Sequence, residues 1–119
     1  VRTGRSFDDA IARCSWPIEL HANAAESHWE ELGDDHIHNV PLGSLLHRDA
    51  DNLAAAGRCI DGDTVGLSSV RVMGPCIATG AAAAHAMILA GSGSVHQVDF
   101  AALRGNISDN LVRTDPYNR

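Results

Sequence analysis

Small residues and a proline mark the part of the sequence that is most suggestive of chemistry. Gly74 and Pro75 open an alanine-rich segment, and the sequence predicts a helix from Met73 to about Ala90. Proline is tolerated in the first turn of a helix. The unpaired N–H groups of that turn, which we expect around Cys76 and Ile77, favour anions and electron-rich carbonyl groups. The sequence therefore suggests an acceptor-binding site here, and a packed helix start without a ligand is the competing interpretation.

Arg71 lies just before this predicted helix, inside a largely apolar run. A guanidinium cannot lose its charge, so a buried Arg71 needs an anionic partner or ample water. That partner could be a carboxylate or phosphate of a substrate. A salt bridge to one of the many acidic side chains of the chain is the alternative.

Histidines and cysteines offer weaker candidates. His36 and His38 would share one face of a strand, and a third ligand such as His47 or Asp35 would complete a metal site. Ordinary surface histidines are the alternative, and we predict no metal. The chain has three scattered cysteines, which indicates reduced thiols in a cytoplasmic protein rather than a disulfide framework. Cys59 and Cys76 as a redox pair is the less favoured interpretation.

The elements that would position these residues follow from patterning and capping. Ser6 and Asp9 predict a short helix that runs through about Arg13. Alternation of apolar and polar side chains predicts strands at 18–21 and 36–40, with a loop at 22–35 between them. A continuous apolar run predicts a buried parallel strand at 53–56, and a turn follows at 61–64. We expect a last helix from Asp99 to about Leu103 and a frayed tail from Thr114.

Composition limits the kinds of partner. Hydrophobic residues make up 45% of the 119 residues but only 4% are aromatic, so the core depends on alanine and should pack closely against other polypeptide. The net charge of −6 argues against binding to a nucleic-acid backbone, which needs clustered Lys and Arg. No apolar stretch approaches the roughly 20 residues of a membrane span. We therefore expect neither a nucleic acid nor a membrane as a partner.

Taken in order, several segments resemble the C-terminal portion of FAD-dependent oxidoreductases of the glutathione-reductase-like, two-dinucleotide-fold type. The resemblance is closest to a bacterial group and extends from about residue 4 to about residue 104. The segments that carry it are 4–13, 17–21, 40–46, 52–60, 69–73 and 80–84.

This resemblance implies an α/β fold: the C-terminal strand–loop–helix piece of an FAD-binding Rossmann-like domain, joined to the end of a substrate domain. Residues 1–47 would end the substrate domain, and residues 48–119 would form the strand–helix segment and a terminal helix. It also implies FAD as the cofactor. The catalytic candidates are His21, as an acid or base on the substrate side, and Arg71; the flavin would lie beside Gly57, Arg58, Met73, Gly74, Pro75, Cys76 and Ile77.

The chain departs from the family pattern where the other half of FAD would bind. It has no Gly-x-Gly-x-x-Gly segment, so we expect the remaining N-terminal FAD-binding polypeptide or subunit to bind the ADP half of FAD. We predict a C-terminal fragment or small subunit, inactive alone, of a cytoplasmic enzyme that transfers a hydride between a small organic substrate and flavin. An oligomer of this protein is compatible with the prediction. Leu42 and Gly43 replace the Tyr-Arg of the family, which favours an alternative: a non-enzymatic binding or assembly module with a remnant flavoprotein fold.

Overall fold

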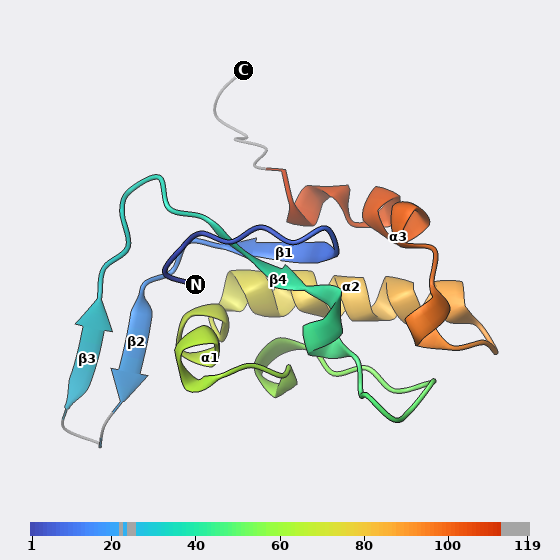
Figure 1. Ribbon diagram of the computed structural model, residues 1–119, viewed down its shortest axis with the longest axis horizontal. Helices are drawn as coiled ribbons and strands as arrows, with labels where there is room; N and C mark the ends of the chain where they lie inside the picture. Colours follow the sequence, from blue (N-terminus) through green and yellow to red (C-terminus); the bar gives the residue numbers. More distant parts are fainter. Residues whose placement is uncertain (22, 24–25, 113–119) are drawn as a thin grey trace.

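Strands occupy the first third of the chain and α-helices the last half (Figure 1). The computed structural model describes residues 1–21, 23 and 26–112, so the expected frayed tail from Thr114 lies outside the described residues. The strands are β1 (Ala10–Cys14), β2 (Ile18–His21), β3 (Ser27–Glu30) and β4 (His38–Pro41). The α-helices in the described residues are α1 (Thr64–Val70), α2 (Met73–Ala90) and α3 (Phe100–Asn106).

The strands form two separate antiparallel pairs. β1 pairs with β4, with Cys14 opposite His38, and β2 pairs with β3, with Ile18 opposite Glu30. The predicted strand at 18–21 is therefore confirmed, and the one predicted at 36–40 is confirmed from residue 38 only, because β4 begins there and His36 lies outside it. The predicted loop at 22–35 is wrong for Ser27–Glu30, which forms β3. The result is a mixed α/β chain in which β1 and β4 lie over α2 and the β2–β3 hairpin extends beside α1 (Figure 1).

The short helix predicted to end near Arg13 is wrong, because Ala10–Cys14 is β1. The sequence suggested that Asp9 caps a helix. Instead the Asp9 carboxylate accepts a hydrogen bond from the Gly43 amide at 3.4 Å, and its carbonyl accepts one from Leu42 at 2.9 Å. Ile11 is fully buried in this strand. Burial between β4 and α2 thus outweighs a local capping preference.

The parallel strand predicted at 53–56 is also wrong. Within the described residues this segment makes an isolated antiparallel bridge, Ala54 with Leu46, and no longer ladder; the Ala55 amide donates to Leu45 O at 2.7 Å. The turn expected at 61–64 leads directly into α1, where the Asp63 carboxylate accepts from the Gly66 amide at 2.6 Å as an N-cap. The strand–loop–helix expectation becomes a loop followed by two helices.

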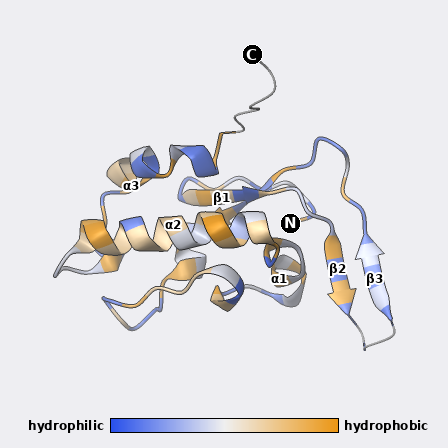
Figure 2. Cartoon of the chain, turned by 180° about the vertical axis from the view of Figure 1, so that it is seen from behind, coloured by the Kyte–Doolittle hydropathy of each residue, from blue (hydrophilic) through white to orange (hydrophobic). Residues whose placement is uncertain are grey.

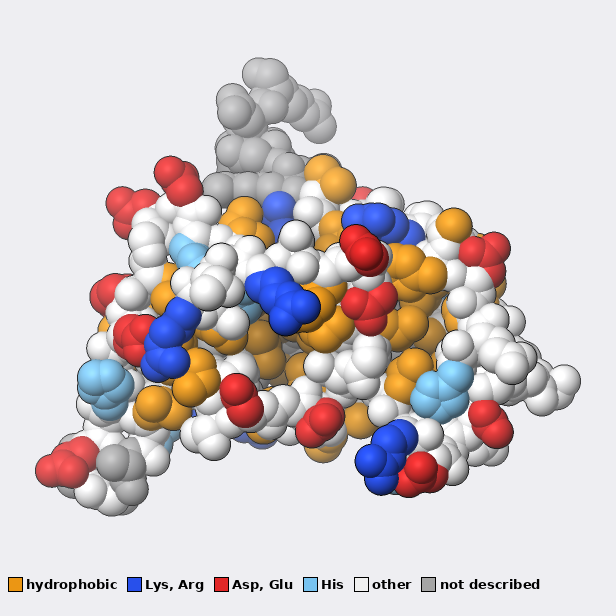
Figure 3. Space-filling model, viewed as in Figure 1, with side chains coloured by type: hydrophobic (Ala, Val, Ile, Leu, Met, Phe, Trp, Pro, Cys, Tyr) orange, Lys and Arg blue, Asp and Glu red, His pale blue; other side chains and the backbone are white. Residues whose placement is uncertain are grey.

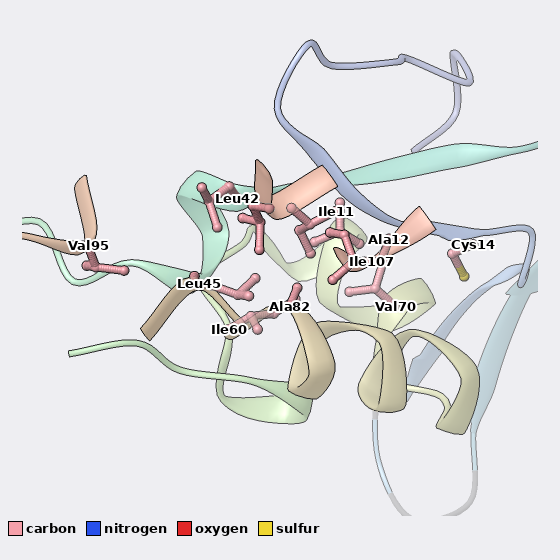
Figure 4. Close-up of a cluster of buried hydrophobic side chains, with 13 residues drawn as sticks. Ile11, Ala12, Cys14, Leu42, Leu45, Ile60, Val70, Ala82, Val95 and Ile107 are labelled. Carbon is pink, nitrogen blue, oxygen red and sulfur yellow. The ribbon is translucent and has the colours of Figure 1, made fainter. Parts of the chain in front are cut away.

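Helix α2 is the central element, and its bounds match the prediction. Gly91 ends it with a φ of +55°, a conformation that favours glycine. The inner face of α2 (Pro75, Thr79, Ala82 and Ala86) is buried. The core cluster draws on β1, β4, α1, α2 and α3, and Figure 4 shows Ile11 of β1, Val70 of α1, Ala82 of α2 and Ile107, just after α3, in this cluster. Alanine on α2 allows this close approach. Asp99 caps α3, as the expected last helix requires.

The outer face of α2 is apolar as well. Met73, Ile77 and Ile88 are 83%, 74% and 73% exposed, and Ala81 and Ala84 complete the same stripe. Figure 2 shows this helix crossing the middle of the view from behind, with hydrophobic turns. By length and composition α2 could cross a membrane, which corrects the expectation that no apolar stretch comes near that length. A helix that is apolar on two sides is normally covered on both.

Candidate functional site

The start of α2 presents open backbone amides, but not those that the sequence indicated. The Cys76 amide donates to Val72 O at 3.1 Å and is therefore occupied. Helix geometry leaves the amides of Met73 and Gly74, one turn earlier, without an intrahelical acceptor, and Pro75 has no N–H. A Cβ added at Gly74 would meet nothing within 4 Å. The backbone here is accessible to a flat ligand.

The turn Gly57–Cys59 packs against the first turns of α2. The Gly57 amide donates to Thr79 Oγ1 at 3.0 Å, and a Cβ at Gly57 would lie 3.7 Å from Cys76 Sγ. Gly57 has a φ of +62°, which disfavours other residues. Arg58 is exposed beside it and makes no ion pair among the described residues. The structure therefore brings Gly57 and Cys76 together, and Arg58 follows Gly57 in the same turn.

Arg71 caps the C-terminal end of α1, two residues before α2 begins. One of its guanidinium N–H groups donates to Glu19 O of β2 at 2.8 Å. The side chain is half-buried, and within the described ranges no carboxylate lies within ion-pairing distance of it. The salt-bridge alternative is therefore not what the structure shows. A guanidinium has five N–H donors, so most of the hydrogen-bonding capacity of Arg71 is left over.

His21 and Arg71 line the same pocket. It has a volume of about 250 Å³ and lies between β2 and α1. His21 Nε2 lies 3.2 Å from Glu19 Oε1, so the Glu19 carboxylate orients the imidazole. The remaining lining residues are Leu20, Thr64, Leu67 and Ser68. The two catalytic candidates, 50 residues apart in sequence, thus face one cavity.

A second polar cluster is buried between β1, β4 and α1. Ser69 Oγ donates to Trp16 O at 2.6 Å, and we infer that it accepts from His38 Nε2 at 3.1 Å because its one proton is already used. Cys14 Sγ donates to Ser69 O at 3.6 Å. Burial lowers the pKa of His38 to about 4 and raises the pKa of the Cys14 thiol. These groups hold β1, β4 and α1 together.

The histidines do not form a metal site in the described part of the chain. The rings of His36 and His38 lie 5.4 Å apart, but no group of three or more His, Cys, Asp or Glu side chains there could hold a metal ion. Neither His47 nor Asp35 supplies the third ligand. His36 Nε2 and His38 Nδ1 are buried without a hydrogen-bond partner among the described residues.

The sequence did not identify Ser68, Thr64 and Thr79 as parts of these sites. Ser68 and Thr64 belong to α1, whose start was taken for a turn. Asp63 as an N-cap was the available signal. Thr79 lies six residues into α2, and nothing in a single sequence marks it as the acceptor for Gly57.

Charges of one sign do not gather into a large patch on the face that Figure 3 shows. Figure 3 shows acidic and basic side chains interspersed on one face of the molecule, around a central group of hydrophobic side chains. Local fields are therefore set by individual groups. In the pocket beside α1 these groups are Arg71, Glu19 and His21.

Comparison with known proteins gives one family. A family model described as FAD dependent oxidoreductase matches residues 1–107, which is most of the 119 residues. Neither the curated proteins nor the solved structures contain a match to this chain.

Proposed function

The chain belongs to the FAD-dependent oxidoreductase family, and on that premise we propose that it is the C-terminal part, or a small subunit, of an enzyme that moves a hydride between an organic substrate and flavin. The observation that carries the proposal is the position of Arg71. This residue lines the pocket together with His21 and lies two residues before the open amides of α2. A substrate site and a cofactor site would therefore be adjacent.

The residues at the start of α2 fit a flavin ring. Met73 and Gly74 offer amides without helical acceptors, and Gly74 leaves open space above the backbone. Such donors stabilise negative charge on an electron-rich ring. Gly57 and Arg58 lie against the same end of α2 and would contact a more polar part of FAD. When bound, FAD supplies the two-electron acceptor or donor for the hydride.

His21 would manage the proton that accompanies the hydride. Its Nε2 is held by Glu19, so Nδ1 is the atom that can accept or donate a proton in the pocket. In the oxidative direction His21 Nδ1 would accept the proton that the substrate gives up when its hydride leaves for the cofactor.

We assign the outer face of α2 to the remaining N-terminal FAD-binding polypeptide. Its stripe of Met73, Ile77, Ala81, Ala84 and Ile88 is apolar and exposed, and its small residues allow close backbone approach. That polypeptide would complete a Rossmann-like sheet and bind the ADP half of FAD. The order of the segments 52–60 and 69–73 supports the glutathione-reductase-like subfamily within this proposal, and the three unpaired cysteines support a reducing cytoplasm.

Purification of the natural polypeptide that contains this chain tests the proposal. Its mass distinguishes a fragment of a larger enzyme from a small subunit, and its visible spectrum reports bound flavin. We expect a yellow protein or complex that an organic donor bleaches in the absence of oxygen. A colourless complex that takes up no added FAD would contradict the proposal and favour the non-enzymatic assembly module.

A further inference from the structure

We propose that the pocket between β2 and α1 binds the carboxylate of a small organic acid, and that Arg71 holds it. This inference rests on the proposed function and adds the chemical class of the substrate. The pocket residues that argue for it are those that supply charge, shape and apolar surface: Arg71, Glu19, Leu20 and Leu67.

Arg71 is half-buried and has unused N–H donors, although donors in such a setting normally have a hydrogen-bond partner. Its one recorded hydrogen bond goes to Glu19 O, and no carboxylate in the described residues neutralises it. Glu19 is the acidic residue whose backbone Arg71 contacts, but its carboxylate lies 3.2 Å from His21 Nε2 and is not paired with Arg71. A half-buried guanidinium without an anion favours an external one, and its planar fork matches the two oxygens of a carboxylate.

The lining favours a carboxylate over a phosphate. Arg71 is the one arginine that lines this pocket, and the acidic Glu19 lines it too, so the lining balances one negative charge better than two. At the start of α1 the Gly66 amide is already bonded to the Asp63 carboxylate, whose negative charge also disfavours a phosphate there. Leu20 and Leu67 instead offer apolar surface for a carbon chain.

The size of the pocket limits the acid. Its volume of about 250 Å³ lies just below the roughly 300–1,000 Å³ of sites for drug-sized ligands. A small acid, such as a six-carbon monocarboxylate, suits that size better than a large one. With the carboxylate on Arg71, the carbon chain would lie in the cavity that His21 also lines. The carboxylate is thus an anchor that orients the reacting carbon.

The test is equilibrium binding of hexanoate to the flavin-loaded protein, measured by titration calorimetry, with neutral hexanamide as the matched probe. We expect hexanoate to bind and hexanamide to bind much more weakly. Arg71→Gln should weaken hexanoate binding about tenfold or more, as the loss of a charge-assisted hydrogen-bonded pair predicts. Arg104→Gln removes the same charge from exposed α3 and should leave binding unchanged.

A second measurement needs no variant. Phenylglyoxal modifies accessible arginines, and hexanoate but not hexanamide should protect Arg71, as read by peptide mass spectrometry. Equal binding of both probes, unprotected Arg71, or unchanged hexanoate binding in Arg71→Gln would overturn the proposal. Loss of flavin from Arg71→Gln with hexanoate binding retained would also overturn it, because Arg71 would then serve the cofactor. A protein that binds hexanoate through Arg71 but never holds flavin would contradict the proposed enzyme and leave the carboxylate site standing.

Discussion

Two polar clusters lie on neighbouring faces of α1, and they contain similar residue types in opposite settings. Ser69 points inward to His38 and Cys14, and these groups bond to one another and to backbone. Ser68, the preceding residue, lines the pocket that also holds His21 and Arg71. The inner cluster is closed to solvent, whereas the outer one is open and has unused hydrogen-bonding atoms.

The contrast shows why residue type alone does not identify a functional site. A serine, a histidine and a cysteine in contact resemble a nucleophilic centre. In this chain, however, His38 is only 2% exposed and Ser69 is fully buried, so no substrate reaches them. The chemistry is expected where donors lack partners, which is the pocket of Arg71. The inner cluster should affect stability, and the outer one should affect function.

The largest expected effect is that of replacing His21, in the open pocket, on the rate of flavin reduction. His21→Gln should slow the reduction of bound flavin by a carboxylate-bearing donor about 10²- to 10⁴-fold, because the proton acceptor is lost. Its stability should change by no more than about 0.5 kcal/mol, since the pair with Glu19 is largely solvated. Anaerobic stopped-flow absorbance and urea unfolding would measure the two quantities. His28→Gln on the adjacent strand β3 is the matched control, and an equal slowing in both variants would refute the role of His21.

The second effect concerns the pH dependence of stability. Burial, with His36 nearby, lowers the pKa of His38 to about 4 from the ordinary 6.5. The unfolded chain therefore binds more protons between these values, and stability is full above pH 6.5 and falls as the pH drops toward 4. The loss attributable to His38 should be about 3 kcal/mol. Urea unfolding across this range would measure it, and His38→Gln should flatten that part of the slope. An unchanged slope in the variant would contradict this account.

The sequence predicted well those elements that local signals determine. Helix α2 has both an opening proline and a terminal glycine, and β2 and β4 alternate clearly, so each appears where expected. Ala10–Cys14 was misassigned because its burial against α2 comes from residues more than 60 positions away. The segment 53–56 has weak strand formers and no partner for a parallel strand in the described residues, so the predicted strand does not form. Single-sequence reasoning cannot weigh such long-range contacts.

The candidate site was predictable in its residues but not in its geometry. Arg71 and His21 were chosen for their chemistry, and nothing in their spacing indicated that they share a pocket. Their meeting depends on α1, which was not predicted, since residues 61–64 were interpreted only as a turn. The open amides were misplaced at Cys76, because in a helix that begins at Met73 the Cys76 N–H is already bonded to Val72 O and only earlier amides are left without an acceptor.

A third test extends the contrast between closed and open surfaces to the two faces of α2. Ala82→Leu adds volume at a fully buried position and should lower the free energy of unfolding by about 1–3 kcal/mol. Ala81→Leu adds the same volume on the exposed face and should change it by no more than about 0.5 kcal/mol. Urea unfolding of the two neighbouring variants gives the comparison. Ala81→Leu should nevertheless weaken association with the FAD-binding polypeptide, and equal association would show that this face is not the interface.

The smallest effect distinguishes the two serines of α1. Ser69→Ala removes a hydroxyl that bonds to both Trp16 O and His38 Nε2, so a part-buried carbonyl and a buried ring nitrogen lose their partner. We expect a loss of about 1–2 kcal/mol in the free energy of unfolding. Ser68 Oγ donates only to Val65 O within its own helix, at 2.7 Å, and alanine is a better helix former than serine. Ser68→Ala should therefore be neutral to within about 0.5 kcal/mol in thermal or urea unfolding. Equal losses in the two variants would mean that the bonds of Ser69 to β4 and to the turn after β1 stabilise the fold no more than a bond inside one helix. The buried and the open side of α1 would then not differ in their contribution to stability.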